Sequence, residues 1–218
     1  MLAVIDYGAG NLRSVLHALR HLGVEDLRLA QHGSALAGAS KIILPGVGAF
    51  GASMEQMRAR DLAAPLLDAL ARGVPYLGIC VGMQMLFDVG EEMGEHRGLG
   101  IIAGRVRRFP AFADRKVPHM GWNQLDLSGG SALFAGLDGR SHVYFVHSYY
   151  CEPRDRSAVI ARVDYGLEFA AAVQCGSIYG VQFHPEKSQM AGLQILSNFL
   201  GIEPLGGSEK VCPAQAKS

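Results

Sequence analysis

Several features that would assign a chain to a particular class are missing from this sequence. Its 218 residues carry 20 basic and 20 acidic side chains, so the formal net charge is zero. A balanced charge gives no indication of a nucleic-acid partner or an anionic membrane partner. The four cysteines include no Cys-x-x-Cys pair and no dense framework, which argues against a zinc site and against a disulfide scaffold. We therefore expect no bound metal.

Long apolar runs are absent as well. No stretch approaches the ~20 apolar residues that a membrane-spanning helix needs. The first apolar run, Leu2–Ile5, meets Asp6 before the core of a signal peptide could form. We therefore expect a cytoplasmic protein without a membrane partner.

The composition that is present favours one folded domain. Hydrophobic residues make up 49% and charged residues 18% of the chain, enough apolar material for a large core. The length fits a single α/β domain. Residues 201–218 are rich in Gly, Pro, Ala and small polar residues, so we expect a domain over 1–200 and a disordered tail over 201–218.

The first half of the chain alternates between two patterns. Short continuous apolar runs are typical of buried strands, and leucines at helical spacing indicate helices between them. The strands are expected at Leu2–Asp6, Ile42–Leu44 and Tyr76–Ile79, and the helices around Leu12–Leu22 and Leu62–Leu70. Buried strands separated by helices predict a mostly parallel sheet covered on both faces.

From about Arg105 the pattern becomes β-rich. Strands are expected at Arg105–Phe109, Val117–Leu125, Val143–Tyr150, Val159–Asp164, Ala170–Gln174 and Ile178–Phe183, followed by a helix at Leu193–Leu200. The predicted fold is therefore α/β, with a mostly parallel central sheet flanked by helices and a β-rich second half.

The segment Gly78–Gln84 carries the clearest chemical signal. Its Gly-x-Cys-x-Gly spacing around Cys80 matches the nucleophile elbow, a sharp turn from a strand to a helix that presents a nucleophile. The glycines leave room for the turn, and the start of the helix predicted through Met83, Leu86 and Phe87 would stabilise a thiolate. The alternative is a buried core cysteine. A core cysteine needs no flanking glycines.

A second segment supplies partners for a cysteine nucleophile. His184 and Glu186 lie two residues apart, so in extended backbone both side chains project to the same side. Pro185 between them biases His184 toward the extended region. The carboxylate could then hold one imidazole nitrogen while the other faces the thiol, as in a Cys–His–carboxylate triad. Alone, the pair could also be solvated at a strand end.

Together these segments resemble the class I, or triad-type, glutamine amidotransferases, over Leu2 to about Leu200. Within that class the chain is most similar to the glutaminase subunits of imidazole glycerol phosphate synthases. The similarity to those subunits is carried by four further segments: Asp6–Asn11, Pro45–Phe50, Pro118–Asn123 and Tyr144–Tyr149. The resemblance implies a flavodoxin-like arrangement of the sheet.

The resemblance also implies roles for particular residues. Cys80 would attack the side-chain amide of glutamine, His184 would transfer protons, and Glu186 would orient His184. The backbone N–H groups of Val47 and Val81 would bind the oxyanion. The expected glutamine-binding residues are Gly48, Gln84, Glu92, Ser148 and Tyr149. No cofactor is implied.

The partner implied by the resemblance is a (β/α)8-barrel cyclase, which would receive ammonia for a step of histidine biosynthesis. The expected contact residues are Asn11, Trp122, Tyr144 and Lys187. From the residues alone, Trp122 could equally be a core aromatic. Lys187 could be a solvated charge.

The sequence also offers other histidines and other functions as alternatives to this interpretation. His119, His142 and His147 lack a carboxylate at the spacing seen beside His184, and His147 is interpreted as structural. Gly8-Ala9-Gly10 only partly matches a dinucleotide-binding fingerprint. The rival functions are an amidotransferase subunit of another pathway, a partner-independent cysteine hydrolase, and a catalytically silent regulatory subunit.

Overall fold

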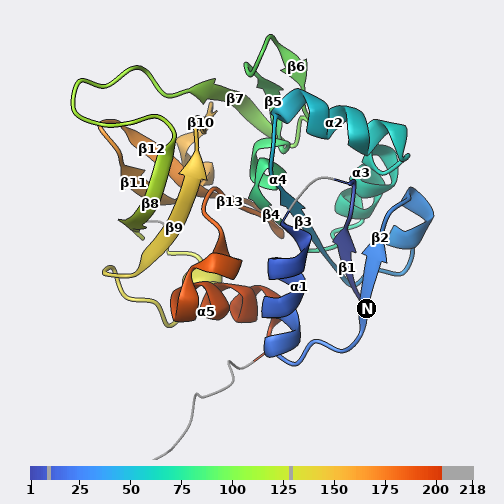
Figure 1. Cartoon of the computed structure of the whole chain (residues 1–218). Coiled ribbons are helices and arrows are strands. Elements are labelled where there is room, and N and C mark those ends of the chain that lie inside the picture. The colour runs from blue at the N-terminus through green and yellow to red at the C-terminus, as the bar shows by residue number, and fades with distance from the viewer. Residues whose placement is uncertain (9–10, 128–129, 203–218) are drawn as a thin grey trace, which may run out of the picture.

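The computed structural model describes residues 1–8, 11–127 and 130–202, which build a central sheet with helices on it and two smaller sheets beside it (Figure 1). The central sheet has seven strands in the order β11-β12-β13-β4-β3-β1-β2. Their bounds are β1 Leu2–Ile5, β2 Leu27–Ala30, β3 Lys41–Gly46, β4 Tyr76–Cys80, β11 Val159–Asp164, β12 Glu168–Cys175 and β13 Ile178–Val181.

Most strand pairs of the central sheet are parallel. β1 runs parallel to β2 and β3, and β4 runs parallel to β3 and β13, while β12 and β11 extend the sheet in antiparallel fashion. The order β2-β1-β3-β4-β13 is that of a flavodoxin-like doubly wound sheet. The predicted fold class is therefore confirmed.

The strand order decides where the helices lie. α1 (Leu12–His21) connects β1 to β2, whereas α2 (Phe50–Ala59) and α3 (Ala63–Ala71) connect β3 to β4 in the opposite direction along the sheet. Right-handed crossovers therefore place α1 on one face and α2 and α3 on the other. In Figure 1, α1 lies near α5 (Gln189–Leu200) and apart from α2 and α3. A sheet of this kind binds ligands beyond the carboxyl ends of its strands.

The β-rich half forms two further sheets. One has the order β10-β7-β5-β6 and the other pairs β8 with β9. Their bounds are β5 Phe87–Gly90, β6 His96–Arg97, β7 Ile102–Arg108, β8 His119–Gln124, β9 His142–His147 and β10 Tyr149–Pro153. The single strand expected at Val143–Tyr150 is thus wrong. It divides at Ser148, because β9 pairs with β8 while β10 pairs with β7 in another sheet.

Two expectations for helices need correction. The helix after Cys80, α4, spans only Val81–Gln84, and Phe87 already belongs to β5. The carbonyls of Met85 and Leu86 accept hydrogen bonds from the Leu99–Ile102 segment instead of continuing a helix. Helix α2 was not expected, although Phe50, Met54 and Met57 recur at helical spacing and are buried.

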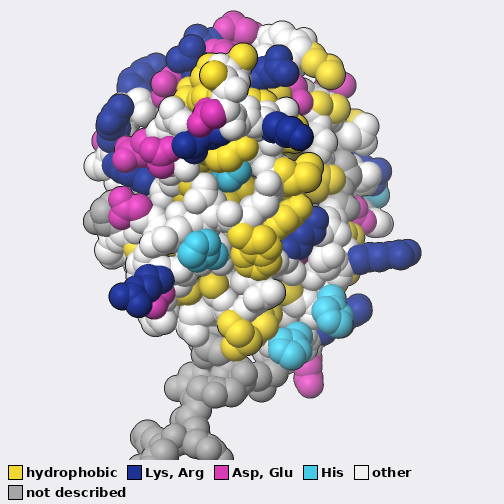
Figure 2. All heavy atoms as spheres, turned by 60° about the vertical axis from the view of Figure 1, so that its left-hand side comes forward, with side chains coloured by type: hydrophobic (Ala, Val, Ile, Leu, Met, Phe, Trp, Pro, Cys, Tyr) yellow, Lys and Arg dark blue, Asp and Glu magenta, His cyan; other side chains and the backbone are white. Residues whose placement is uncertain are grey.

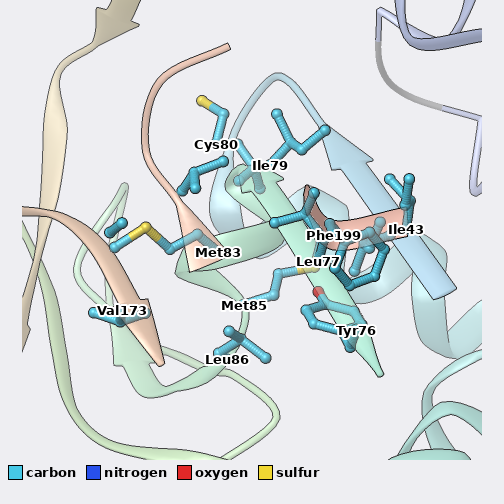
Figure 3. Close-up of a cluster of buried hydrophobic side chains, with 14 of the residues drawn as sticks. Ile43, Tyr76, Leu77, Ile79, Cys80, Met83, Met85, Leu86, Val173 and Phe199 are labelled. Carbon is cyan, nitrogen blue, oxygen red and sulfur yellow. The ribbon is translucent and has the colours of Figure 1, made fainter. Parts of the chain in front are cut away.

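The core fills the space between the sheet and the helices. Figure 3 shows part of it, where Tyr76 and Leu77 of β4 pack with Met85, Leu86 and Phe199. Tyr76 is fully buried, and its hydroxyl donates a hydrogen bond to the carbonyl of Gly82 (2.8 Å). At the end of α5, Gly201 adopts the left-handed conformation (φ 70°) typical of a helix C-terminus. The rest of the expected tail, 203–218, lies outside the described residues, as do Ala9 and Gly10.

Candidate active site

Cys80 stands at the junction of β4 and α4, at the carboxyl end of a central strand. Its backbone has φ 54° and ψ −108°, a combination that L residues rarely adopt and that marks a strained turn. In Figure 3 its side chain leaves the end of β4 and points away from Met85 and Leu86. The geometry is that of the expected nucleophile elbow, whereas the short α4 gives little support from a helix dipole.

The glycines around Cys80 are needed for space. A Cβ on Gly78 would lie 2.3 Å from the carbonyl oxygen of Gly82, and a Cβ on Gly82 would lie 2.0 Å from the carbonyl oxygen of Leu44. Both obstacles are backbone atoms, which cannot move aside as a flexible side chain would. Close packing of the turn against β3 therefore fixes both glycines.

Gly82→Ala is expected to destabilise the fold by about 3 kcal/mol or more, because overpacking costs about 1–3 kcal/mol even where side chains can yield. Thermal unfolding measures the effect. Gly139→Ala is the matched control, since a Cβ there meets nothing within 4 Å and Gly139 has no left-handed φ. Equal melting temperatures for the two variants would contradict the packing described above.

His184 and Glu186 form a buried pair. The Nδ1 atom of His184 lies 2.8 Å from Oε1 of Glu186, and the two side chains are only 2% and 1% exposed. The backbone N–H of His184 donates to the carbonyl of Tyr144 (2.9 Å), which fixes the segment against β9. Oε1 of Glu186 also accepts a hydrogen bond from Nδ2 of Asn11 (3.5 Å).

The local backbone that joins this pair differs from expectation. β13 ends at Val181, and Pro185–Lys187 form a single 3-10 turn (η4) in place of an extended strand. Proline favours the first position of such a turn because its φ is already fixed near the helical value. The N–H of Lys187 accordingly donates to the carbonyl of His184 (3.0 Å). The turn, rather than strand alternation, brings the two side chains together.

The imidazole of His184 is held in its charged form. Burial alone would lower the pKa of His184, but its interactions with the Cys80 thiol and the Glu186 carboxylate outweigh burial and raise that pKa to about 10. Among the described residues, the buried Nε2 atom of His184 has no hydrogen-bond partner in this structure. A positive imidazolium beside the sulfur favours a thiolate.

One cavity of about 500 Å³ opens beside Cys80 and His184. This volume falls within the range of small-molecule sites. The structure brings nearly all of the expected residues to its wall: Val47, Gly48, Cys80, Val81, Gln84, Glu92, Ser148, Tyr149 and His184. Glu186 stands behind His184. The expected roles of these residues remain predictions, and their convergence on one cavity supports them.

The loop after β3 forms one side of this cavity, and glycine serves a different purpose at Gly46 and at Gly48. Gly48 has φ +95°, in the left-handed region that favours glycine, whereas Gly46 lies outside that region. Gly46 is required for space instead, because a Cβ there would lie 2.8 Å from the Tyr7 hydroxyl and 2.9 Å from Cβ of Val81. Beyond the loop, Oε2 of Glu92 accepts a hydrogen bond from the N–H of Phe50 (2.7 Å), which ties Glu92 to the start of α2.

Gln182 was given no role from the sequence. Its side chain is fully buried, and its Nε2 atom lies 3.5 Å from Sγ of Cys80. The local sequence carries no signal for this contact, because Cys80 lies 102 positions away and β13 ends at Val181, before Gln182.

Two further buried histidines, His119 and His147, contact each other. Nδ1 of His119 lies 3.0 Å from Nε2 of His147, and His119 stacks between Phe145 and Tyr165. Burial lowers the pKa of His119 to about 4 and that of His147 to about 3, so both rings are neutral at physiological pH. His142 is exposed.

The expected contact residues lie on the surface near the site. Trp122 is 47% exposed, so it is not a core aromatic. Its ring centroid lies 6.0 Å from that of Tyr144, and Nζ of Lys187 lies 5.8 Å from the Tyr144 centroid. Figure 2, in which the side with β8 and β9 comes forward, shows hydrophobic side chains gathered near the middle of this face.

Residues 1–8, 11–127 and 130–202 contain neither a metal-ligating cluster nor a membrane-spanning helix. In those ranges no three His, Cys, Asp or Glu side chains are grouped to hold a metal ion. Nor does any helix there have the length and apolar character to cross a membrane. Cys151 is buried, which raises the pKa of its thiol well above the usual value, whereas Cys175 is exposed.

Comparisons with known proteins agree on one group. The model of the family described as "Glutamine amidotransferase class-I" matches residues 3–202. A protein of Syntrophotalea carbinolica named "Imidazole glycerol phosphate synthase subunit HisH" is 49% identical, over 91% of this chain and 98% of its own. One of the same name from Rhodopirellula baltica is 48% identical, over 91% and 96%.

Solved structures share the fold at lower identity. A structure described as "Crystal structure of glutamine amidotransferase" superposes with a TM-score of 0.71 at 21% identity, covering 91% of this chain and 97% of that one. "Structure of PurLQS from Thermotoga maritima" gives a TM-score of 0.72 at 20% identity, covering 92% and 97%.

Proposed function

Because this chain belongs to the class-I glutamine amidotransferases, we propose that it is the glutaminase subunit of imidazole glycerol phosphate synthase. The observation that carries the proposal is the convergence of Cys80, His184 and the backbone of Val47 and Val81 on one cavity, with Glu186 bound to His184. Relatives at 45–49% identity that bear the name of this subunit support the pathway. A biosynthetic role with glutamine as substrate also supports a cytoplasmic location.

The proposed reaction uses Cys80 and His184 as a thiolate–imidazolium pair. The Cys80 thiolate attacks the amide carbon of glutamine, and the N–H groups of Val47 and Val81 stabilise the oxyanion. The His184 imidazolium gives its proton to the nitrogen, so ammonia leaves and a γ-glutamyl thioester remains. Neutral His184 then takes a proton from water, whose oxygen attacks the thioester. Collapse releases glutamate and restores the thiolate and imidazolium.

Gln84, Glu92, Ser148 and Tyr149 are proposed to hold the α-amino and α-carboxylate groups and the amide of glutamine, with Gly48 giving close access to the backbone. All of them line the cavity. The ammonia is proposed to pass to a (β/α)8-barrel cyclase subunit, where it enters the imidazole-forming step of histidine biosynthesis. No cofactor is needed for hydrolysis by this route.

The test is release of glutamate and ammonia by the pure chain, alone and with the cyclase and its ligand. We expect slow hydrolysis alone and strong stimulation in the complex. Fast hydrolysis without any partner would favour a cysteine hydrolase. If glutamine is not hydrolysed under any of these conditions, the proposed function is wrong.

The exposed Trp122 is proposed to anchor the cyclase, with Asn11, Tyr144 and Lys187 around it. Buried tryptophans at interfaces often contribute 2 kcal/mol or more, so Trp122→Ala is expected to weaken the complex about 30-fold. Leu29→Ala is the control, because Leu29 is also an exposed apolar residue (40%) but lies on the edge strand β2. Titration of the two subunits measures the affinity, and unchanged binding by Trp122→Ala would remove Trp122 from the interface.

A further inference from the structure

Gln182 is a fully buried polar side chain next to the proposed nucleophile. Its backbone N–H donates to the carbonyl of Ala171 (2.8 Å), which anchors the residue beside β12. Its side chain reaches Cys80, with Nε2 3.5 Å from Sγ. A buried amide is costly unless its donors and acceptor are paired, so the partners of Gln182 determine how it lies.

A backbone carbonyl fixes the direction of this amide. The carbonyl of Tyr149 can only accept hydrogen bonds, so the side-chain atom of Gln84 that lies 3.2 Å from it must be the NH₂ group. The same NH₂ group lies 3.0 Å from the Gln182 side chain, which must therefore present its oxygen to Gln84. The NH₂ group of Gln182 is left to face the sulfur of Cys80.

The buried histidine pair donates to the same Tyr149 carbonyl. Nδ1 of His147 lies 2.9 Å from the Tyr149 carbonyl and must carry a proton there. In a neutral ring Nε2 of His147 is then an acceptor, and it takes a hydrogen bond from Nδ1–H of His119 (3.0 Å). Each step allows only one tautomer, so the direction of donation runs without a break from His119 to the carbonyl. The lowered pKa values of both histidines keep this state across the physiological range.

We propose that Gln182 is a further catalytic residue, whose side-chain NH₂ donates to Sγ of Cys80 and stabilises the thiolate, and that Gln84 and the Tyr149 carbonyl hold the amide in this orientation. The proposal rests on the proposed function and adds a contact with the reacting sulfur. With the amide turned over, its oxygen would face the thiolate and repel it.

The hydrogen bond from Gln182 to Sγ of Cys80 matters in those steps of the reaction in which the sulfur gains or loses its negative charge. Sulfur is anionic before attack, loses its charge in the thioester and regains it when water displaces it. A donor fixed on the sulfur favours the anion in the resting enzyme and as the leaving group. Hydrogen bonds to charged groups correspond to about tenfold to a hundredfold in an equilibrium.

The test is the pH dependence of Cys80 alkylation by iodoacetamide, followed by mass spectrometry of the peptide that contains Cys80. Gln182→Met keeps the length and removes the donor. We expect its alkylation midpoint to rise by about one to two pH units. Gln174→Met is the matched control and should keep the wild-type profile. The Gln174 side chain forms hydrogen bonds with Ser131 and Gly176 and takes no part in the hydrogen bonds around Gln182 and Cys80.

The measurement needs neither glutamine nor a partner, so it separates this proposal from the proposed function. A wild-type midpoint in folded Gln182→Met would overturn the role of Gln182, even if the glutaminase assay is positive. If Gln182→Met does not fold, Gln84→Met decides the matter, because it removes the NH₂ group that donates to the Gln182 oxygen. The Gln182 amide can then turn over, so the midpoint should rise as well. A wild-type midpoint in folded Gln84→Met would overturn the proposal.

Discussion

Cys80→Ala is expected to abolish glutamine-dependent synthesis by the assembled enzyme while leaving synthesis from added ammonia largely intact. Removing a nucleophile typically lowers turnover on the order of 10⁶-fold. No other thiol described by the structure can replace it, because Cys151 is buried with a raised pKa and Cys175 lies at the far end of β12. Assays with glutamine and with ammonium salts, run on the same complex, measure both activities.

Cys175→Ala serves as the matched control and should retain both activities, since Cys175 is exposed and does not line the cavity. Loss of both activities in Cys80→Ala, with the complex still assembled, would contradict the division of labour between the two subunits. Retention of glutamine-dependent activity would remove Cys80 from the reaction.

Glu186→Gln is expected to lower turnover about 10³- to 10⁴-fold, the usual effect of losing the carboxylate of a triad. The amide keeps the shape of Glu186 but loses the charge that accepts from Nδ1 of His184 at 2.8 Å. Steady-state glutaminase kinetics of the complex measure the loss. Glu168→Gln, on an exposed glutamate of β12, is the control and should behave as wild type. A small effect at Glu186 would mean that another group orients His184.

The same substitution should change the pH dependence. Glu186 is one of the groups that raise the pKa of His184 to about 10, so without it the proton leaves at lower pH. The alkaline limb of turnover should therefore move to lower pH. A folded pKa raised above the ordinary 6.5 stabilises the fold fully below pH 6.5, and this contribution is lost as pH rises toward 10. Glu186→Gln should show less of this alkaline destabilisation.

Much of the site could be predicted from local sequence. Gly78, Cys80 and Gly82 indicate the elbow because a tight turn against a neighbouring strand leaves no room for a Cβ at either glycine. His184 and Glu186 could be paired because only Pro185 lies between them in the sequence. Apolar runs and helical spacing sufficed for β1, α1 and β4, since strands buried on both faces are continuously apolar and a helix buried on one face repeats its apolar residues at helical spacing.

Local pattern failed where contacts between distant residues decide the structure. The strand expected at Val143–Tyr150 divides because its halves join different sheets, and α4 ends early because the carbonyls of Met85 and Leu86 bond a later segment. The spacing of apolar residues along one segment does not show which distant segment it will pair with.

The sequence by itself therefore predicted the fold class and indicated Cys80, His184 and Glu186 as the proposed nucleophile and its partners, because each of these signals depends on residues close together in the chain. Only the tertiary structure decided that Gln182 contacts Cys80, 102 positions away, and that His119 and His147 meet within one hydrogen-bonded chain. A buried amide or imidazole must find its donors and acceptors wherever the fold supplies them. The hydrogen bonds of Gln182, His119 and His147 are therefore fixed by how β13, β9 and β8 pack around the site and not by the neighbours of these residues in the sequence.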